Sequence, residues 1–322
     1  MNGKKFFWTF FLGASIIIGT KVSLMIHMRT SFPPPIYHRI STDAKTWFLS
    51  SIKEKDSFKH AILGSSLGLN NLDGNTLEEK LNEKVINFSS WGLTPKQTHQ
   101  LSSVYLKYFD SIENITIVVQ TLDFFTDDSL DDDDLTLMDH YFKHSFSSQV
   151  NFYWKLLPRF RTQFKYWLNY NKNHMNPSRY QFLGFDNTGS VPLHIPQGNI
   201  SNHRFNTPHQ NLLKKDSFLT LRNLISFLKD EKALNVNILI SPYRNKVIEK
   251  SETLSAQNEF SRKEILEISH EFGIDVYDSQ QDFGDKDHLF VDRSHLNPSG
   301  SKLLTIAYVD KLYSQREDAG EL

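Results

Sequence analysis

The 322-residue chain contains no cysteine. Disulfide bonds, thiolate catalysis and cysteine-ligated metal sites are therefore excluded, and the absence of thiols is compatible with an oxidising compartment. An excess of charge of one sign is also absent, because 36 basic and 37 acidic side chains leave a formal net charge of −1. With no basic stripe either, the sequence does not indicate nucleic-acid binding. No two of the 13 histidines have the spacing of a zinc motif, and we expect neither a metal nor a cofactor.

The first 30 residues are typical of a membrane anchor. Lys4 and Lys5 precede an apolar segment, residues 6–26, whose single charge is Lys21 near its far end. About 20 apolar residues cross the hydrocarbon core of a bilayer, and a lysine near the end of a span reaches the interface. Since the basic residues come first, we expect a single-pass cell-membrane protein with a periplasmic or extracellular body. The alternatives are a cleaved signal peptide, although no small-x-small site follows, and a buried helix, although a polar face is lacking.

Residues 31–56 contain three consecutive prolines and many polar residues, and are predicted to form a stalk between membrane and body. Residues 57–322 alternate short apolar segments with helical patterns, which is typical of a parallel sheet with crossover helices. The predicted fold is α/β: a three-layer α/β/α, flavodoxin-like sandwich with a mainly parallel five-stranded sheet. Strands are expected at residues 60–64, 84–88, 115–125, 235–242 and 274–277. Helices are expected at residues 95–109, 216–229, 253–272 and 298–313.

Polar motifs stand at the carboxyl ends of three predicted segments, where open α/β sheets form their binding sites. The first is Ser65-Ser66 after Gly64, at the turn from the first strand to a helix. A serine there exposes its hydroxyl at the sheet edge, and nearby backbone N–H groups are available to an oxyanion. We predict Ser66 as a nucleophile. Ordinary turn and helix-cap composition is the alternative interpretation.

The second motif is Asp292-x-x-His295, which is followed by a helical pattern. This spacing places both side chains on one side of a loop, so that the carboxylate orients an imidazole that accepts a proton from a serine. A solvated loop histidine is the alternative. The third motif contains Gly92, after the second strand, where a glycine lets the backbone approach a ligand closely. A plain turn glycine is the alternative there.

The order of these three motifs resembles the SGNH/GDSL hydrolase superfamily over residues 58–125 and 216–315. The serine, the glycine and the Asp-x-x-His motif match the family's nucleophile block, second block and last block, while Ser65 stands where many members have aspartate. The segments ILGSSLGLNNLD, INFSSWGLTPKQ and FVDRSHLNPSG are similar to membrane-anchored exported members of the D-alanyl transfer and alginate O-acetyltransferase types. The resemblance implies that His295, held by Asp292, deprotonates Ser66, which attacks an acyl ester or thioester.

The resemblance also implies an oxyanion held by the backbone N–H groups of Ser66 and Gly92. The third block departs from the family pattern, because Gln120-Thr121-Leu122-Asp123 replaces Gly-x-Asn-Asp and its donor asparagine. Gln120 as a substitute donor, or Asp123 in a polar role, are the two interpretations of this change. Arg244, after the fourth strand, is a candidate contact for an anionic substrate, with a surface arginine as the alternative.

The function expected from this resemblance is serine-dependent transfer of an O-acyl group to, or its removal from, an exported polysaccharide or cell-envelope polymer. The expected acyl group is acetyl. The expected partners are an acyl donor, the acceptor polymer and a multi-span membrane acyltransferase that supplies the donor. One alternative is an esterase acting on small or lipid esters. The other is a non-catalytic assembly or binding protein that keeps a degenerate SGNH fold.

About 90 residues after the third strand, residues 126–215, do not follow the α/β alternation and are predicted to be an inserted subdomain or lid. The insertion begins with an acidic run, for which a solvated loop is favoured over a calcium site. Its aromatic segment is interpreted as the subdomain's core, as a sugar-stacking surface or as a bilayer contact. Because the third strand ends beside Ser66, we expect one wall of the groove here, with Trp154, Trp167 or Tyr170 exposed toward the nucleophile.

Overall fold

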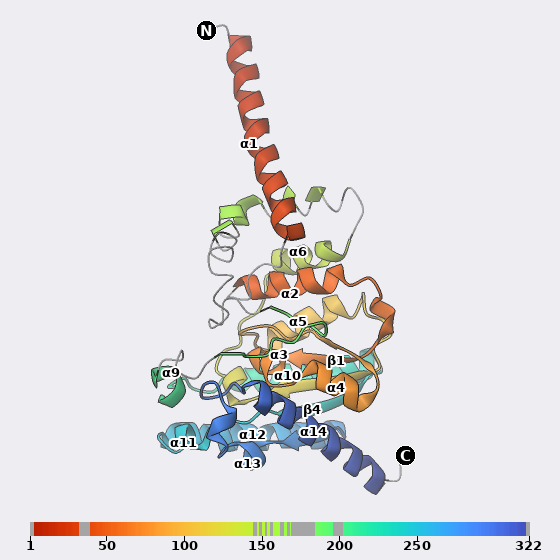
Figure 1. Ribbon diagram of the computed structural model, residues 1–322, viewed down its shortest axis with the longest axis vertical. Helices are drawn as coiled ribbons and strands as arrows, with labels where there is room; N and C mark the ends of the chain where they lie inside the picture. The colour runs from red at the N-terminus through yellow and green to blue at the C-terminus, as the bar shows by residue number, and fades with distance from the viewer. Residues whose placement is uncertain are drawn as a thin grey trace.

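The computed structural model describes residues 3–31, 39–143, 184–195 and 202–319, together with short pieces between 147 and 168. A five-stranded sheet with strand order β2-β1-β3-β4-β5 forms the centre of the body (Figure 1). The strands are β1 Phe58–Gly64, β2 Lys84–Asn87, β3 Asn114–Val119, β4 Asn235–Ile240 and β5 Asp275–Asp278. Every neighbouring pair is parallel. The predicted α/β sandwich is therefore confirmed, and each of the five strands lies in its predicted region. The strand predicted at residues 115–125 is wrong in its second half, because β3 ends at Val119 and Thr121–Phe124 form a helical turn at the sheet edge.

Helices follow the strands and cover both faces of this sheet. They are α1 Gly3–Ser31, α2 Arg39–Ser51, α3 Ser66–Asn70, α4 Gly74–Leu81, α5 Pro95–Tyr105, α6 Asp132–Phe142, α9 Asn202–Asn206, α10 Lys215–Ser226, α11 Asn245–Ile248, α12 Glu252–Phe272, α13 Gln280–Phe283 and α14 Pro298–Ala319. Shorter helical turns are η1 Lys55–Ser57, η2 Thr121–Phe124, η3 Leu157–Arg159, the π-helical η6 Phe227–Glu231 and η7 Asp287–Leu289.

Successive side chains of each strand point to opposite faces, which divides the core in two. In β1, Ala61 and Leu63 pack in the core that contains α5, α10 and α12. The intervening Ile62 packs with residues of α4 and α14 on the other face. This alternation explains why the strands read as nearly continuous apolar runs in the sequence, since both faces are buried.

The stalk predicted for residues 31–56 is wrong over Arg39–Ser51, because these residues form α2 within the body. Ala44 and Leu49 of α2 are fully buried, and α2 lies against α6. In Figure 1, α2 and α6 form a layer between the sheet and α1. The polar composition of this segment obscured the helix, whose buried residues become recognisable only once α6 is packed against them.

The N-terminal helix α1 projects from the body, and the chain's two ends lie at opposite ends of the molecule (Figure 1). Within the described residues, α1 is the one helix long and apolar enough to cross a membrane, over Gly3–His27. Its first 18 described residues are almost all exposed, including Phe7, Trp8 and Phe11. The helix therefore has the form of an anchor by length and composition.

The insertion is described in two parts. The first part contains α6, whose Leu137, Met138 and Tyr141 are buried in the same core as α5 and α10. The second part contains residues 184–195 and α9. Thr188 accepts the backbone N–H of Asn87 at the end of β2, Val191 donates to Leu69 of α3, and Arg204 of α9 contacts Asp292. The predicted insertion thus packs on two different regions of the body.

Candidate active site

The proposed nucleophile stands at a sharp turn between β1 and α3. Gly64 ends the strand with φ at +151°, and a side chain there would meet the carbonyl oxygen of Val118 at 2.5 Å. Only glycine fits this close approach of two strands. The next residue, Ser65, caps α3, its hydroxyl oxygen accepting a hydrogen bond from the N–H of Leu67 at 3.3 Å. This turn leaves Ser66 partly exposed at the carboxyl edge of the sheet.

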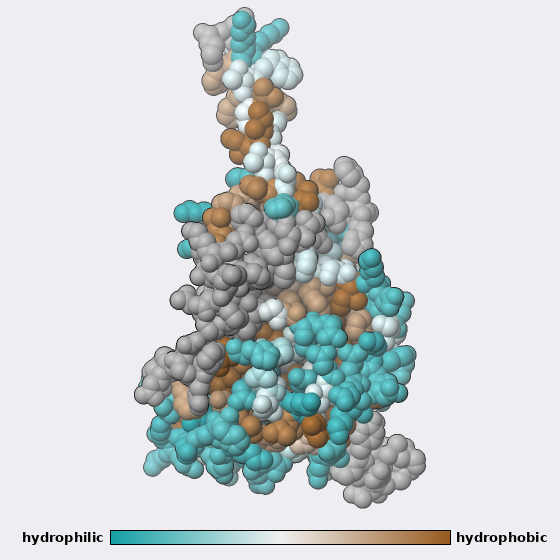
Figure 2. Space-filling model, in the orientation of Figure 1, coloured by the Kyte–Doolittle hydropathy of each residue, from teal (hydrophilic) through white to brown (hydrophobic). Residues whose placement is uncertain are grey.

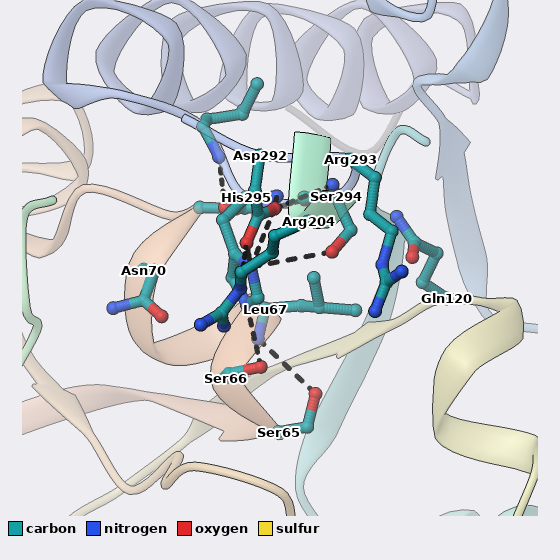
Figure 3. Close-up of polar contacts among 12 residues, drawn as sticks. Ser65, Ser66, Leu67, Asn70, Gln120, Arg204, Asp292, Arg293, Ser294 and His295 are labelled. Carbon is teal, nitrogen blue, oxygen red and sulfur yellow. Dashed lines mark hydrogen bonds and ion pairs between the residues drawn. The ribbon is translucent and has the colours of Figure 1, made fainter. Parts of the chain in front are cut away.

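Ser66, His295 and Asp292 form one hydrogen-bonded chain (Figure 3). The Ser66 hydroxyl lies 2.9 Å from His295 Nε2, and His295 Nδ1 lies 3.0 Å from each carboxylate oxygen of Asp292. With the Nδ1 proton directed at the carboxylate, Nε2 is left to accept the serine proton. The proximity predicted from the sequence is therefore confirmed, with Asp292 on the far side of the ring from the serine. Catalysis by the three residues stays a prediction.

Asp292 is held in place by its own loop. Its Oδ1 accepts hydrogen bonds from the backbone N–H groups of Ser294, at 2.9 Å, and His295, at 2.8 Å. Burial alone would raise the pKa of this carboxyl, but the charge and hydrogen bond of His295, the Ser294 N–H and the nearby Arg204 hold the pKa well below its usual range. Asp292 is therefore ionised and fixes both the orientation and the tautomer of the imidazole.

Two further residues contact the hydrogen-bonded chain of Ser66, His295 and Asp292, and neither was predicted from the sequence. Arg204, on α9 of the insertion, places Nε 3.1 Å from Asp292 Oδ2. Trp91 lies over the His295 ring, with ring centroids 5.8 Å apart and planes 19° from parallel. Arg204 is separated from Asp292 by 87 intervening positions, so only the fold brings them together. Trp91 was detectable only as the neighbour of Gly92.

Gly92 follows β2 as predicted and has a φ of +68°, in the region that glycine adopts without strain. It is exposed, and no heavy atom lies within 4 Å of the position a Cβ would take. The turn before it is tied to the nucleophile turn, because the N–H of Ser90 donates to the carbonyl of Gly64 at 3.4 Å. Open space at Gly92 is compatible with close approach of a ligand, as the sequence predicts.

The interpretation of Gln120 as an oxyanion donor is wrong in this structure. Its side-chain Nε2 donates to the carbonyl oxygens of Ser241, at 3.2 Å, and Pro242, at 2.6 Å. Both N–H groups of the amide are thereby used to join the ends of β3 and β4. Gln120 is buried, with 1% of its surface exposed, and stabilises the sheet edge instead of facing the nucleophile.

Asp123 has the polar role that was the other interpretation of the third block. Its Oδ2 accepts the backbone N–H of Gln120 at 2.8 Å, and Ser65 hydrogen-bonds to the same carboxyl group. Burial raises the pKa of Asp123 to about 7, against the lowering effect of these two hydrogen bonds. Ser65, Asp123, Leu93 and Leu221 line a small apolar pocket behind the nucleophile turn. The Ser65–Asp123 pair therefore joins η2 to the turn that carries Ser66.

Neither interpretation of Arg244 holds, because this side chain is buried with 2% of its surface exposed. Its Nε donates to Asp287 Oδ1 at 3.0 Å, and its guanidinium carbon lies 3.5 Å from the ring centroid of Phe205. Arg244 also donates to the carbonyl of Phe205. Since Phe205 is the neighbour of Arg204, this buried arginine fixes α9 against the site and is not placed to bind a substrate.

Among the described residues of the insertion, those of the second part contact the site, while a groove wall formed by the insertion stays a prediction. Arg204 contacts Asp292. Val191 forms two hydrogen bonds with α3: its N–H donates to the carbonyl of Leu69, and its carbonyl accepts the side-chain amide of Asn70. The described neighbours of Trp154 instead pack on the core beside α1 and α2. The other two rings named in that expectation, Trp167 and Tyr170, lie outside the described residues.

Comparison with known proteins gives no relative that would identify the chain. No known family matches the sequence, and no characterised protein is significantly similar to it. The superfamily resemblance therefore depends on the motifs themselves and on the geometry of Ser66, His295 and Asp292.

Proposed function

We propose that the protein is a membrane-anchored, extracytoplasmic serine acyltransferase or esterase of the SGNH type. The observation that supports this proposal is a chain of two hydrogen bonds. Ser66 Oγ lies 2.9 Å from His295 Nε2, and His295 Nδ1 lies 3.0 Å from the carboxylate of Asp292. A hydroxyl, an imidazole and an ionised carboxylate in this order are the components of nucleophilic acyl transfer.

In the proposed reaction, His295 Nε2 takes the proton of Ser66 as Oγ attacks the acyl carbon of an ester or thioester. The tetrahedral intermediate collapses when the donor's alkoxide or thiolate leaves with the proton from His295, and the acyl group remains on Ser66. A hydroxyl of a polysaccharide or cell-envelope polymer then gives its proton to His295 as its oxygen attacks the acyl carbon. The bond from that carbon to Ser66 Oγ breaks, and Oγ takes the proton back from His295, which regenerates the serine. Water in place of that hydroxyl completes hydrolysis.

Asp292 and Arg204 have positioning roles in this proposal. Asp292 keeps the Nδ1 proton directed toward itself and stabilises the imidazolium that forms in each half of the reaction. Arg204 keeps Asp292 ionised and fixed in orientation through its 3.1 Å contact. We expect the backbone N–H groups of Ser66 and Gly92 to hold the oxyanion, with no donor from Gln120.

The site of action in this proposal is outside the cytoplasm. Lys4 and Lys5 precede the apolar part of α1, which favours a cytoplasmic N-terminus and an exported body. An exported polymer as the acceptor, and a multi-span membrane protein as the source of the acyl donor, belong to the same proposal. They rest on the resemblance stated above and on the form of α1.

The test uses the full-length protein in detergent and a fluorophosphonate probe, which phosphonylates an activated serine. We expect stoichiometric labelling of Ser66, loss of labelling in Ser66→Ala, and partial labelling in Ser65→Ala, whose capping hydroxyl supports the turn. Ser103→Ala on α5 is the folding control and should label as the unmodified protein does. Labelling that survives in Ser66→Ala would overturn the assignment of the nucleophile.

A non-catalytic binding protein is the second candidate, favoured by the engagement of Gln120 with Ser241 and Pro242, which leaves the third-block donor without a replacement. Loss of one oxyanion donor typically lowers the rate by about 10²–10³. A folded protein with no labelling of Ser66 would favour this candidate. Assays with an activated acetyl ester, with and without a glycan acceptor, distinguish the transferase from the esterase.

A further inference from the structure

The free part of α1 is shorter than a bilayer is thick. Residues 6–20 make no burying contact with the body, whereas the ammonium group of Lys21 lies 5.7 Å from the ring centroid of Phe160. Four residues later, Met25 is 2% exposed and belongs to the main core. The 15 free residues rise about 1.5 Å each, roughly 22 Å in all. A hydrocarbon core is about 30 Å thick.

The difference places part of the body at membrane level. If the hydrocarbon begins after Lys5, its outer boundary lies roughly five helical residues beyond Thr20. That boundary coincides with Met25, which the body already encloses. If Lys21 instead marks the outer interface, its neighbour Phe160 lies at that interface. In both cases the part of the body that touches the end of α1 is in contact with lipid.

At this level the body presents the described residues between 147 and 168 of the insertion, among them Phe160 beside Lys21, and we call these described residues the shoulder. Figure 1 shows its short helical pieces, in light green, beside the last turns of α1. In Figure 2, apolar surface continues from α1 onto the top of the body around its base. The described side chains of the shoulder include exposed apolar residues, Val150 at 54%, Trp154 at 68% and Leu168 at 38%.

The shoulder has the composition of an interfacial surface. Leu157 and Phe160 pack inward on the core, so the shoulder is attached to the body while Trp154 remains exposed. Tryptophan is enriched at membrane–water interfaces, where its ring lies at the level of the headgroups. The exposed Arg161 and Lys165 supply cations that attract the phosphate groups of lipid headgroups.

We propose that the shoulder lies beside α1 at the outer surface of the membrane that α1 spans, and that it binds lipid headgroups there. The body is then held against the bilayer by two contacts, a spanning helix and an interfacial surface, and not by a flexible stalk. This fixes the orientation of the carboxyl edge of the sheet relative to the membrane. The proposal rests on α1 as a spanning helix but not on the chemistry of Ser66.

The absence of cysteine allows each position to be probed by a single introduced thiol. Trp154→Cys and Val150→Cys report on the shoulder, and Ile17→Cys reports on the middle of α1. Leu303→Cys, 48% exposed on α14 at the opposite end of the molecule, is the matched control. Each full-length variant is labelled with a fluorophore and reconstituted into vesicles of phosphatidylethanolamine and phosphatidylglycerol. Quenching by headgroup-level nitroxide lipid is compared with quenching by aqueous iodide.

We expect labels at 154 and 150 to be quenched by the nitroxide lipid and to be at least threefold less sensitive to iodide than the label at 303. The label at 17 should respond to lipid quenchers alone. If the labels at 154 and 150 behave like that at 303 while the label at 17 is lipid-shielded, the shoulder proposal is overturned and the anchor stands. If the label at 17 is also reached by iodide, both are overturned. Neither result bears on labelling of Ser66.

Discussion

The two described parts of the insertion belong to one stretch of chain but pack against different regions of the molecule. The first part, with α6 and the shoulder, buries its apolar side chains beside α1, α2 and α5. The second part, residues 184–195 and 202–209, reaches the carboxyl edge of the sheet and contacts Asp292 through Arg204. The first part contains the exposed Trp154, and the second contains Arg204, which contacts Asp292.

This difference shows that a long insertion after a strand need not act as a single lid. Of the described residues, α6 and the shoulder pack toward the anchor, whereas residues 184–195 and α9 contact the site. Lys45 of α2 links the two regions, because its ammonium donates to the carbonyl oxygens of Asn87, at 2.8 Å, and Gly189. Burial lowers the pKa of Lys45 well below its usual value, and the charge of Asp186 opposes that effect.

The largest expected effect is a loss of stability when Lys45, which links the two regions, is substituted. Lys45→Met keeps the volume of the side chain but leaves the carbonyl oxygens of Asn87 and Gly189 without their donor. A buried group that loses its hydrogen bond costs roughly 1–3 kcal/mol, so we expect the free energy of unfolding to fall by about 2–4 kcal/mol. Urea unfolding measures this. Lys53→Met, exposed just after α2, is the control, and an equal loss in both variants would contradict the role of Lys45.

The second prediction compares arginines from the two parts of the insertion. Arg204→Gln removes a charged contact to Asp292, and such hydrogen bonds contribute roughly 1.5–3 kcal/mol, so we expect kcat/KM to fall about 10- to 100-fold. Asp292 keeps its two backbone donors, which is why activity should not vanish. Arg161→Gln in the shoulder should change kcat/KM less than twofold. Turnover of an activated acetyl ester by the full-length protein is the measurement.

Equal losses in the two arginine variants would remove the functional distinction between the two parts. Restoration by Arg204→Lys adds a further check, because a lysine supplies the charge without the planar fork of the guanidinium. We expect Arg204→Lys to lie between Arg204→Gln and the unmodified protein. A purely structural role of Arg204 would instead lower the melting temperature of both Arg204 variants in parallel with their activity.

The third prediction concerns pH. The pKa of Asp123, about 7 in the folded protein, lies above its ordinary value of 3.8, so between these values the folded state binds more protons than the unfolded state. Stability linked to this group is therefore full below about pH 4, falls as pH rises through 7 and is lost above it. Asp123→Asn cannot ionise, and between pH 5 and pH 8 its unfolding free energy should change less than that of the unmodified protein, by roughly 2–3 kcal/mol.

Thermal unfolding at the two pH values measures this difference, as a few degrees in Tm. The exposed Asp128→Asn is the matched control, and its change between pH 5 and pH 8 should equal that of the unmodified protein. Asparagine at position 123 still accepts the N–H of Gln120 through its carbonyl oxygen. A change in Tm that is as large in Asp123→Asn as in the unmodified protein would show that Asp123 does not titrate in this range.

The sequence predicted the sheet well because the signal for a parallel buried strand is local. Five apolar runs, each followed by a turn, were sufficient to locate β1 to β5, although the third run continues past the end of β3 into the helical turn η2. The Asp292-x-x-His295 spacing was predictive for the same reason, since four consecutive residues define one side of a loop. The order of the serine, glycine and histidine motifs along the chain then placed them at one edge of the sheet.

The remaining parts depend on contacts that no local pattern reveals. The α2 helix was missed because its most buried polar residue, Lys45, is stabilised by carbonyl oxygens far away in the chain. Arg204 was missed because α9 is short and polar, and Arg244 was misjudged because its partner Asp287 and the ring of Phe205 bury it. In each case tertiary pairing buries a charged side chain or places it in the site, which its residue type alone does not predict.

The smallest expected effect is a difference in activity between alanine variants of two tryptophans, one beside the site and one in the shoulder. Trp91 stacks on the His295 ring, and an aromatic pair contributes about 0.5–1.5 kcal/mol, so Trp91→Ala should lower kcat/KM roughly 2- to 10-fold. Trp154 belongs to the shoulder, and its described neighbours are core residues beside α1. Trp154→Ala should therefore leave kcat/KM within twofold for a small activated ester and for a polymeric acceptor alike. A selective loss with the polymer in Trp154→Ala would instead return this ring to the substrate groove, where the sequence first predicted it. Parallel measurements of both variants on both acceptors decide between these outcomes, because Trp91 contacts the reacting imidazole and should affect the two substrates equally.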